Sequence, residues 1–197
     1  MNANLKVSKI LLILIFLASS CQNTVMYSRL LRVNYGRVSE KKLIKYLVKN
    51  KIDTSYSYFA ANSFYEKIYE PKFQSDSGIA LNEFRPIQFR VFDSIGNHVN
   101  TWANCYGPIS FFAKDVSDLL VKKANKDIVL NTRLSDYLEL MKGSPTITAS
   151  DYDIIIVAYW QWYMVNYSLN MLKQLQSLPN LNNKKVLLIK LNMDYSK

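Results

Sequence analysis

The sequence contains little cysteine and histidine, which limits the chemistry open to it. Its 197 residues include two cysteines, Cys21 and Cys105, and one histidine, His98. No pair of Cys or His residues has the spacing of a zinc site. Asp151 and Asp153 lie two residues apart before an apolar run, and turn formation explains them better than a metal ion does. We therefore predict no metal, no cofactor and no complete set of catalytic residues.

Acidic residues are also scarce, with 15 Asp and Glu against 25 Lys and Arg, for a formal net charge of +10. Much of the excess lies between Arg29 and Lys51, where Glu40 is the single acidic residue. Such a segment is attracted to polyanions, either nucleic acid or an anionic membrane surface. The alternative is a solvated, partly disordered stalk without a particular partner. The composition, 49% hydrophobic and 20% charged, is typical of a folded protein and excludes general disorder.

The apolar run near the amino terminus, residues 10–17, is too short to span a membrane. Its eight residues cover about 12 Å as a helix, against a hydrocarbon core about 30 Å thick. Lys6 and Lys9 precede this run, and the small residues at 18–20 lead to Cys21. This arrangement predicts a cleaved signal peptide at residues 1–20 and an exported protein. Export argues against a nucleic-acid partner.

The small residues directly before Cys21 resemble the lipobox of bacterial lipoproteins, in which the cysteine receives diacylglycerol and becomes the new amino terminus. Leu17 lies one place earlier than in the usual pattern, and Ala18 takes its position. The resemblance implies a lipid at Cys21 that anchors the protein to a bacterial membrane, with the basic segment adding attraction to anionic lipid. An ordinary secretory signal cut beside Cys21 is the alternative. No acidic cluster follows Cys21, so on this resemblance we expect the protein to face the periplasm.

After the signal peptide we predict a basic tether and helical region at residues 21–80 and an α/β domain at residues 81–197. From Ser39, a plausible cap, apolar residues recur with helical spacing while lysines occupy the other face. This amphipathic helix would either dock on the domain or lie on the membrane. The aromatic-rich stretch from Tyr58 to Tyr69 predicts a second helix.

The domain itself shows the patterns of a hairpin followed by a β-α-β unit. Ile87, Phe89 and Val91 alternate with polar neighbours, a turn follows, and an extended pattern resumes up to Cys105. The remaining predicted elements are helices near residues 116–120 and 134–141, strands over residues 153–160 and 185–191, and a helix over residues 167–178. The first of these strands is continuously apolar, which predicts burial on both faces. Two parallel strands joined by a right-handed crossover helix are the economical arrangement.

Residues 154–162, the helix after them and residues 186–194 resemble the core of a thioredoxin-like protein, closest in style to the membrane-tethered TlpA-type group. The resemblance covers about Asp151 to Asp194 and implies an α/β fold, a thioredoxin-like β-α-β core with an added β-hairpin and N-terminal helices. The family's Cys-x-x-Cys falls on Tyr163-Met164-Val165-Asn166, which has no cysteine and cannot exchange disulfides.

The family's cis-proline and its closing hairpin and helix have no counterpart after the second strand of this unit. We expect the hairpin that ends at Cys105, or a partner chain, to pair with the two strands instead. An uncovered sheet edge would favour homo-oligomers.

The most distinctive cluster of side chains is aromatic and lies where the first of these strands ends. The functional hypothesis is a patch that binds a ligand or a partner, because large rigid aromatic side chains suit such contacts and α/β sheets bind ligands at this edge. A covered corner of the core is the alternative reading. The predicted site residues are Trp160, Trp162, Tyr163, Asn166 and Tyr167.

These patterns together predict a membrane-tethered, non-catalytic thioredoxin-like lipoprotein that binds or scaffolds an unknown component of the cell envelope. The alternative is a degenerate thiol oxidoreductase, or a redox-partner subunit, that uses Cys105. A lone cysteine in a strand is more often a small buried hydrophobe, and His98 on the same hairpin would have to face it. A purely structural lipoprotein that self-assembles through its sheet edge is the third possibility.

Overall fold

The computed structural model describes residues 38–67, 87–104, 132–177 and 184–194. By its internal contacts the chain divides into two units, Met1–Tyr35 and Gly36–Lys197, and the described residues all belong to the second unit. The predictions for the signal peptide, Cys21, residues 29–37, Cys105 and the helix near residues 116–120 lie outside the described residues.

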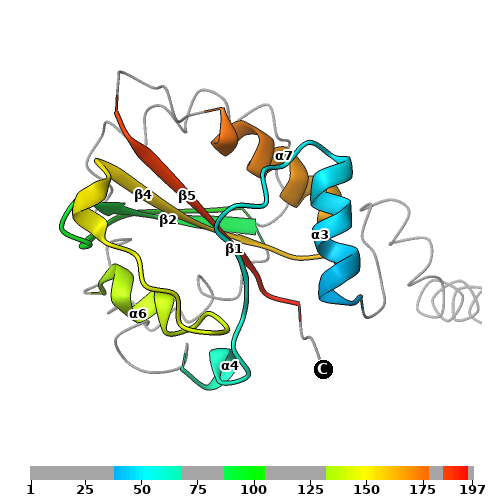
Figure 1. Cartoon of the computed structure of the whole chain (residues 1–197), viewed down its shortest axis with the longest axis horizontal. Helices are drawn as coiled ribbons and strands as arrows, with labels where there is room; N and C mark the ends of the chain where they lie inside the picture. Colours follow the sequence, from blue (N-terminus) through cyan, green and yellow to red (C-terminus); the bar gives the residue numbers. More distant parts are fainter. Residues whose placement is uncertain (1–37, 68–86, 105–131, 178–183, 195–197) are drawn as a thin grey trace, which may run out of the picture. The chain divides into compact units, whose positions relative to one another are not determined.

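The described residues form a mixed α/β fold around one five-stranded sheet (Figure 1). In space the strands follow the order β1-β5-β4-β2-β3. The strands are β1 Ser57–Phe59, β2 Ile87–Asp93, β3 His98–Asn104, β4 Ile154–Trp160 and β5 Val186–Asn192. The helices are α3 Glu40–Lys49, α4 Phe64–Lys67, α6 Leu134–Leu138, the 3-10 turn η5 Ala149–Asp151 and α7 Val165–Gln176. Strand β5 is parallel to both β1 and β4, whereas β2 is antiparallel to both β4 and β3.

The predicted strand-helix-strand unit is present as β4, α7 and β5. Its two strands run parallel, with Ile154 opposite Val186 and Trp160 opposite Asn192. Every residue of β4 is buried, as its continuous apolar sequence predicts. Helix α7 begins at Val165, two residues before the expected start.

The predicted hairpin is also confirmed, and it pairs antiparallel with β4, with Phe89 opposite Ala158. Asp93 organises its turn, because its Oδ1 accepts hydrogen bonds from the backbone N–H groups of Ile95 (3.1 Å) and Asn97 (2.8 Å). Gly96 takes a φ of +81°, a conformation that suits glycine. The alternation along β2 does not expose its polar residues, since strands on both sides of β2 and the packing on its faces bury them.

Helix α3 matches the predicted amphipathic helix and packs on the domain. The Ser39 side chain caps it by accepting from the Lys42 N–H (3.4 Å), and Leu43 and Leu47 are buried. The helix lies beside α7 in Figure 1, and the side chain of Gln176 at the end of α7 donates to the backbone carbonyl of Lys51 (3.1 Å). The compact unit therefore includes residues before position 81, where we expected the domain to begin.

The helix predicted over residues 58–69 is wrong for residues 58–63, and residues 68 and 69 lie outside the described residues. Residues Ser57–Phe59 form strand β1, and only the four residues Phe64–Lys67 are helical. Parallel pairing with β5, more than 130 positions later in the sequence, holds β1 extended and overrides its local aromatic pattern. Part of the outer edge of β1 is already occupied, since the Phe59 carbonyl accepts from the Lys142 N–H (2.8 Å).

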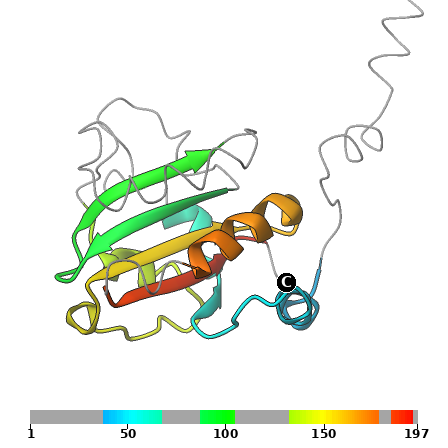
Figure 2. The same ribbon diagram turned by 90° about the horizontal axis from the view of Figure 1, so that it is seen from above.

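The sheet separates two packing layers (Figures 1 and 2). On one face, Phe64 of α4 and the buried residues of α6 pack against a row of apolar side chains from the sheet. That row comprises Phe92, Ile155, Val157, Tyr159, Leu187, Ile189 and Leu191. On the other face, the buried leucines of α7 contribute to the core. The predicted site lies on this second face, where β4 ends and α7 begins.

Candidate functional site

Strand β4 ends inside the molecule, and the chain reaches the surface only after it. Trp160, the last residue of β4, is 1% exposed and belongs to the core. Trp162 and Tyr163, in the turn that follows, are half-buried. In the first turn of α7, Asn166 is exposed and Tyr167 is half-buried. The structure thus divides the predicted cluster into one core residue and four residues that reach the surface.

Asp194 holds this turn to the end of β5, and sequence analysis did not identify it. Its Oδ2 accepts hydrogen bonds from the Trp162 N–H (2.6 Å) and from the Asn192 side-chain amide (2.8 Å). The Asp194 N–H in turn donates to Asn192 Oδ1 (3.1 Å). Burial raises the pKa of Asp194, although the hydrogen bonds from Trp162 and Asn192 act in the opposite direction. The carboxyl group therefore fixes the backbone on which the surface aromatic residues stand.

A second hydrogen-bonded link fixes the other side of the same turn. The Ser168 hydroxyl of α7 donates to the Gln161 carbonyl (3.3 Å), and its oxygen lies at the same distance from the Gln161 N–H. Ser168 is fully buried. The turn that carries Trp162 and Tyr163 is therefore tied to both α7 and β5, so its aromatic side chains stand on a preorganised backbone.

Helix α3 completes the surface of this corner. The Tyr46 and Trp162 rings meet edge to face, with centroids 5.0 Å apart. The Lys42 Nζ lies 5.4 Å from the centre of the Trp162 ring, within the range of a cation–π contact. We call the surface formed by Tyr46, Trp162, Tyr163, Asn166 and Tyr167 the aromatic corner. Sequence analysis did not join Tyr46 to it, because only the packing of α3 brings the two segments together.

The aromatic corner offers contact area and hydrogen bonds but no evident route to covalent chemistry. Tyr163 and Asn166 occupy the positions where the thioredoxin-like resemblance places the redox cysteines, and neither has a thiol. Within the described residues there is no group of three or more side chains able to hold a metal ion. What this arrangement supplies is aromatic contact area and hydrogen-bonding groups at the surface.

A buried charged residue, Lys190, lies within β5. The Lys190 side chain is 2% exposed, donates to the Leu188 carbonyl (3.3 Å) and has its Nζ 3.9 Å from Asp53 Oδ2. Burial lowers the pKa of Lys190, and the charge of Asp53 acts in the opposite direction. The hydrogen bond from the Ser55 N–H (3.0 Å) lowers the pKa of Asp53.

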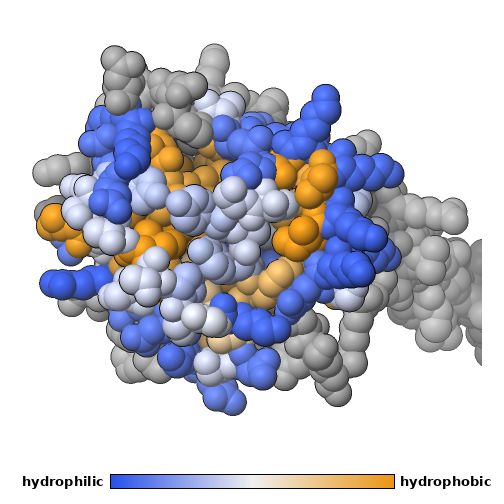
Figure 3. Space-filling view, viewed as in Figure 1, coloured by the Kyte–Doolittle hydropathy of each residue, from blue (hydrophilic) through white to orange (hydrophobic). Residues whose placement is uncertain are grey.

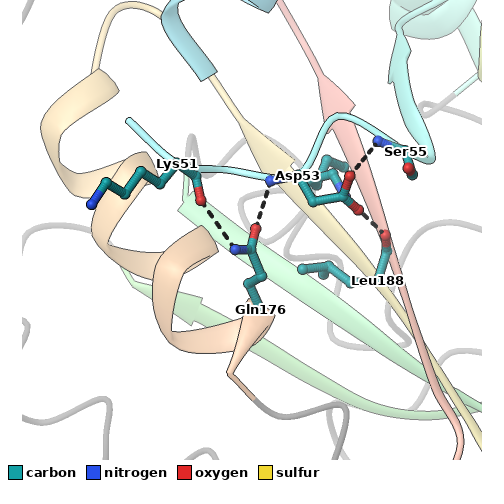
Figure 4. A network of polar contacts seen from close by, with 6 residues as sticks. Lys51, Asp53, Ser55, Gln176 and Leu188 are labelled. Atoms are coloured by element: carbon teal, nitrogen blue, oxygen red, sulfur yellow. Dashed lines mark hydrogen bonds and ion pairs between the residues drawn. The ribbon is translucent and has the colours of Figure 1, made fainter. Parts of the chain in front are cut away.

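Gln176 joins this group to helix α7. Its Oε1 accepts from the Asp53 N–H (2.7 Å), while its Nε2 donates to the Lys51 carbonyl (3.1 Å) (Figure 4). The segment between α3 and β1 is thus bound to both α7 and β5. We read the Lys190 network as a structural link, since it connects the segment after α3 with α7 and β5.

His98 is also buried, on the hairpin. Its Nε2 lies 2.9 Å from the Thr101 hydroxyl, which also accepts a hydrogen bond from Arg90, and its ring packs near Phe92 with centroids 5.6 Å apart. Cys105, the thiol of the alternative redox reading, lies outside the described residues. His98 therefore lies inside the fold, next to the polar side chains of Thr101 and Arg90.

Two further findings bear on identity. Among the described residues, none of the helices has the length and apolar character needed to cross a membrane. Comparison of the chain with known protein families, with curated proteins and with solved structures finds no match.

Proposed function

We propose that the protein is an exported lipoprotein, anchored at Cys21, whose α/β domain binds another component of the cell envelope through the aromatic corner. The observation that carries the binding role is the position of the corner. Half-buried aromatic side chains stand beside the exposed Asn166 at the carboxyl end of β4, next to a turn that Asp194 and Ser168 hold in place. A rigid surface of this kind loses little entropy on binding and supplies large contact areas.

The proposal for the anchor depends on sequence. The apolar run at residues 10–17 is short, small residues follow it, and Cys21 comes next. Growth of a bacterial host on an alkyne analogue of palmitate should label the wild-type protein and leave Cys21→Ala unlabelled. Equal labelling of the two, or none of the wild type, would remove the lipid anchor from the proposal.

A thioredoxin-like ancestry is part of the same proposal. The parallel pair β4 and β5 with crossover helix α7 supports it, as does the antiparallel hairpin beside β4. In this chain the hairpin precedes the β-α-β unit, whereas the resemblance places a closing hairpin after it. The domain would then use the scaffold for binding, since the positions of the redox cysteines carry Tyr163 and Asn166.

Site-specific photocrosslinking in the native envelope tests the binding role. A photoreactive residue at Asn166, which is exposed in the corner, should give an adduct of defined mass. The matched control is Ile95, which is 74% exposed at the hairpin turn, at the opposite end of the sheet. Trp162→Ala should lower the yield of the adduct formed from position 166. Adducts of equal yield from both positions, or from neither, would contradict a binding role for the corner.

A further inference from the structure

Helix α3 carries a row of lysines on the side that faces away from the domain. Lys41, Lys45 and Lys49 follow one another at intervals of four residues and are all exposed. At 3.6 residues per turn this spacing places them along one side of the helix, opposite the buried side that carries Leu43 and Leu47. Hydrophilic side chains border α3 on its outer side in Figure 3. We call these three lysines the lysine row.

The charge of the lysine row is not neutralised by the described part of the protein. Glu40, the acidic residue of α3, forms an ion pair with Lys142 (3.1 Å). Among the described residues, no carboxylate lies within ion-pair distance of the lysine row. The row therefore presents three adjacent positive charges to whatever lies outside the domain.

The structure also shows how α3 uses its apolar side. Leu43 and Leu47 are buried in the domain, so they are not available for insertion into lipid. Val48, at 60% exposure, is the sole strongly exposed apolar residue of the helix. An amphipathic helix binds within the interface through its apolar face, and α3 has already buried that face against protein. A membrane contact of α3 is therefore electrostatic and superficial.

We propose that the lysine row docks on the surface of an anionic phospholipid bilayer as a peripheral contact without insertion. This inference rests on the proposed anchor at Cys21, which would hold the helix near the membrane. The segment from Cys21 to Glu40 is 19 residues and reaches about 65 Å at full extension, so it leaves α3 free to lie against the bilayer. The anchor raises the local concentration of the row at the surface, and a few charges then suffice to orient the domain.

Docking through the lysine row would also bring the aromatic corner close to the bilayer. Tyr46 of α3 contacts Trp162, and Lys42 lies over the same ring. The corner therefore adjoins the helix that faces the membrane. A partner would therefore bind to the corner close to the bilayer, and an integral or lipid-anchored envelope protein is located there.

Residue-resolved amine labelling tests the contact on the mature lipidated protein. The protein is reconstituted on vesicles of phosphatidylcholine alone or with 30% phosphatidylglycerol, treated with a membrane-impermeant acetylating reagent and analysed by mass spectrometry. We expect labelling of the lysine row to fall at least threefold on the anionic vesicles and to recover in 0.5 M NaCl, because salt screens such contacts. Lys67 on α4 and the exposed Lys184 serve as internal controls and should not change.

A charge-reversal variant sharpens the test. In Lys45→Glu, labelling of Lys41 and Lys49 should become equal on the two kinds of vesicle, whereas the matched surface variant Lys184→Glu should keep the difference. Equal labelling of the row on both vesicles in the wild type, or protection of Lys67 instead, would overturn the proposal. Equal protection by single-stranded RNA at the same phosphate concentration would overturn the assignment to lipid.

Flotation of the same samples separates this inference from the proposed anchor. Flotation with neutral vesicles supports the anchor whatever the labelling shows. Flotation with anionic vesicles alone, lost in Lys45→Glu, would support the lysine row and contradict the anchor. Flotation with neither kind would overturn both.

Discussion

Lys190 shows how a single charged residue can be accommodated within an otherwise apolar strand. Its ammonium group is buried and 3.9 Å from the nearest carboxylate oxygen, that of Asp53, whose side chain is 57% exposed. Burial leaves the charged form of this group poorly solvated, which is why the pKa of Lys190 is lowered. The charge itself therefore contributes little to stability, and the aliphatic part of the side chain contributes the packing.

Replacement of Lys190 and replacement of Asp53 should accordingly change the free energy of unfolding in different ways. We expect Lys190→Met to be neutral or to raise the free energy of unfolding by about 1 kcal/mol, because it keeps the volume and removes a buried charge. Asp53→Ala should lower it by about 1 kcal/mol, since it leaves the ammonium without its carboxylate and the Ser55 N–H without its acceptor. Urea unfolding of both variants measures these values. A loss above about 2 kcal/mol in Lys190→Met would contradict this account.

Asp194 gives the stability a pH dependence of known sign. Its pKa is raised from an ordinary value of 3.8, so the folded protein binds this proton more tightly than the unfolded chain does. The stabilisation from protonated Asp194 is present below the unfolded value and is lost as the pH rises through the raised one. The unfolding free energy of the wild type minus that of Asp194→Asn should therefore fall between about pH 3.5 and pH 7. The exposed carboxylate of Asp151 provides the control, and Asp151→Asn should not reproduce this trend.

At the scale of residues, sequence analysis identified surface aromatics better than buried polar groups. Trp162, Tyr163 and Tyr167 reach the surface at the predicted place, whereas Trp160 is enclosed in the core. Neither Asp194 nor Lys190 was predicted to matter. Lys190 interrupts an apolar run, and this was a readable signal, but its partner Asp53 lies 137 positions earlier and only the fold brings them together.

At the scale of elements, α3 is an integral part of the fold. Leu47 is fully buried, so Leu47→Ala should lower the free energy of unfolding by about 2 to 4 kcal/mol. The neighbouring Val48→Ala should change it by less than about 0.5 kcal/mol, because Val48 is largely exposed. Denaturant unfolding of the two variants makes the comparison. A similar small effect of both would mean that α3 does not pack on the domain in solution.

Elements with a strong local pattern were predictable, and those fixed by distant pairing were not. The apolar runs of β4 and β5, the turn after Asp93 and the cap at Ser39 each carry their own signal. Strand β1 has three residues in an aromatic stretch that could equally be helical. Its extended form depends on the hydrogen bonds that β5 offers, and no local pattern records them.

At the scale of the whole molecule, the position of β1 and α3 defines where an autonomous domain can begin. A chain that starts at Gly36 retains the edge strand, the buried leucines of α3 and the link between Asp53 and Lys190. We expect it to unfold cooperatively in urea with a native near-ultraviolet circular dichroism signal. A chain that starts at Leu81 lacks all three features and should show neither property. Cooperative unfolding of the shorter chain would support the predicted domain boundary at residue 81.

The order of strands in the sheet has a consequence for the timing of folding. Strand β5 is the latest in sequence among the described strands, yet it lies between β1 and β4 in space. During synthesis, β1 emerges with no neighbour to pair with until β5 has been made, so the sheet cannot close early. A nascent chain with this delay stays open for longer, which would suit the export that we propose, because a secretion channel admits only unfolded polypeptide.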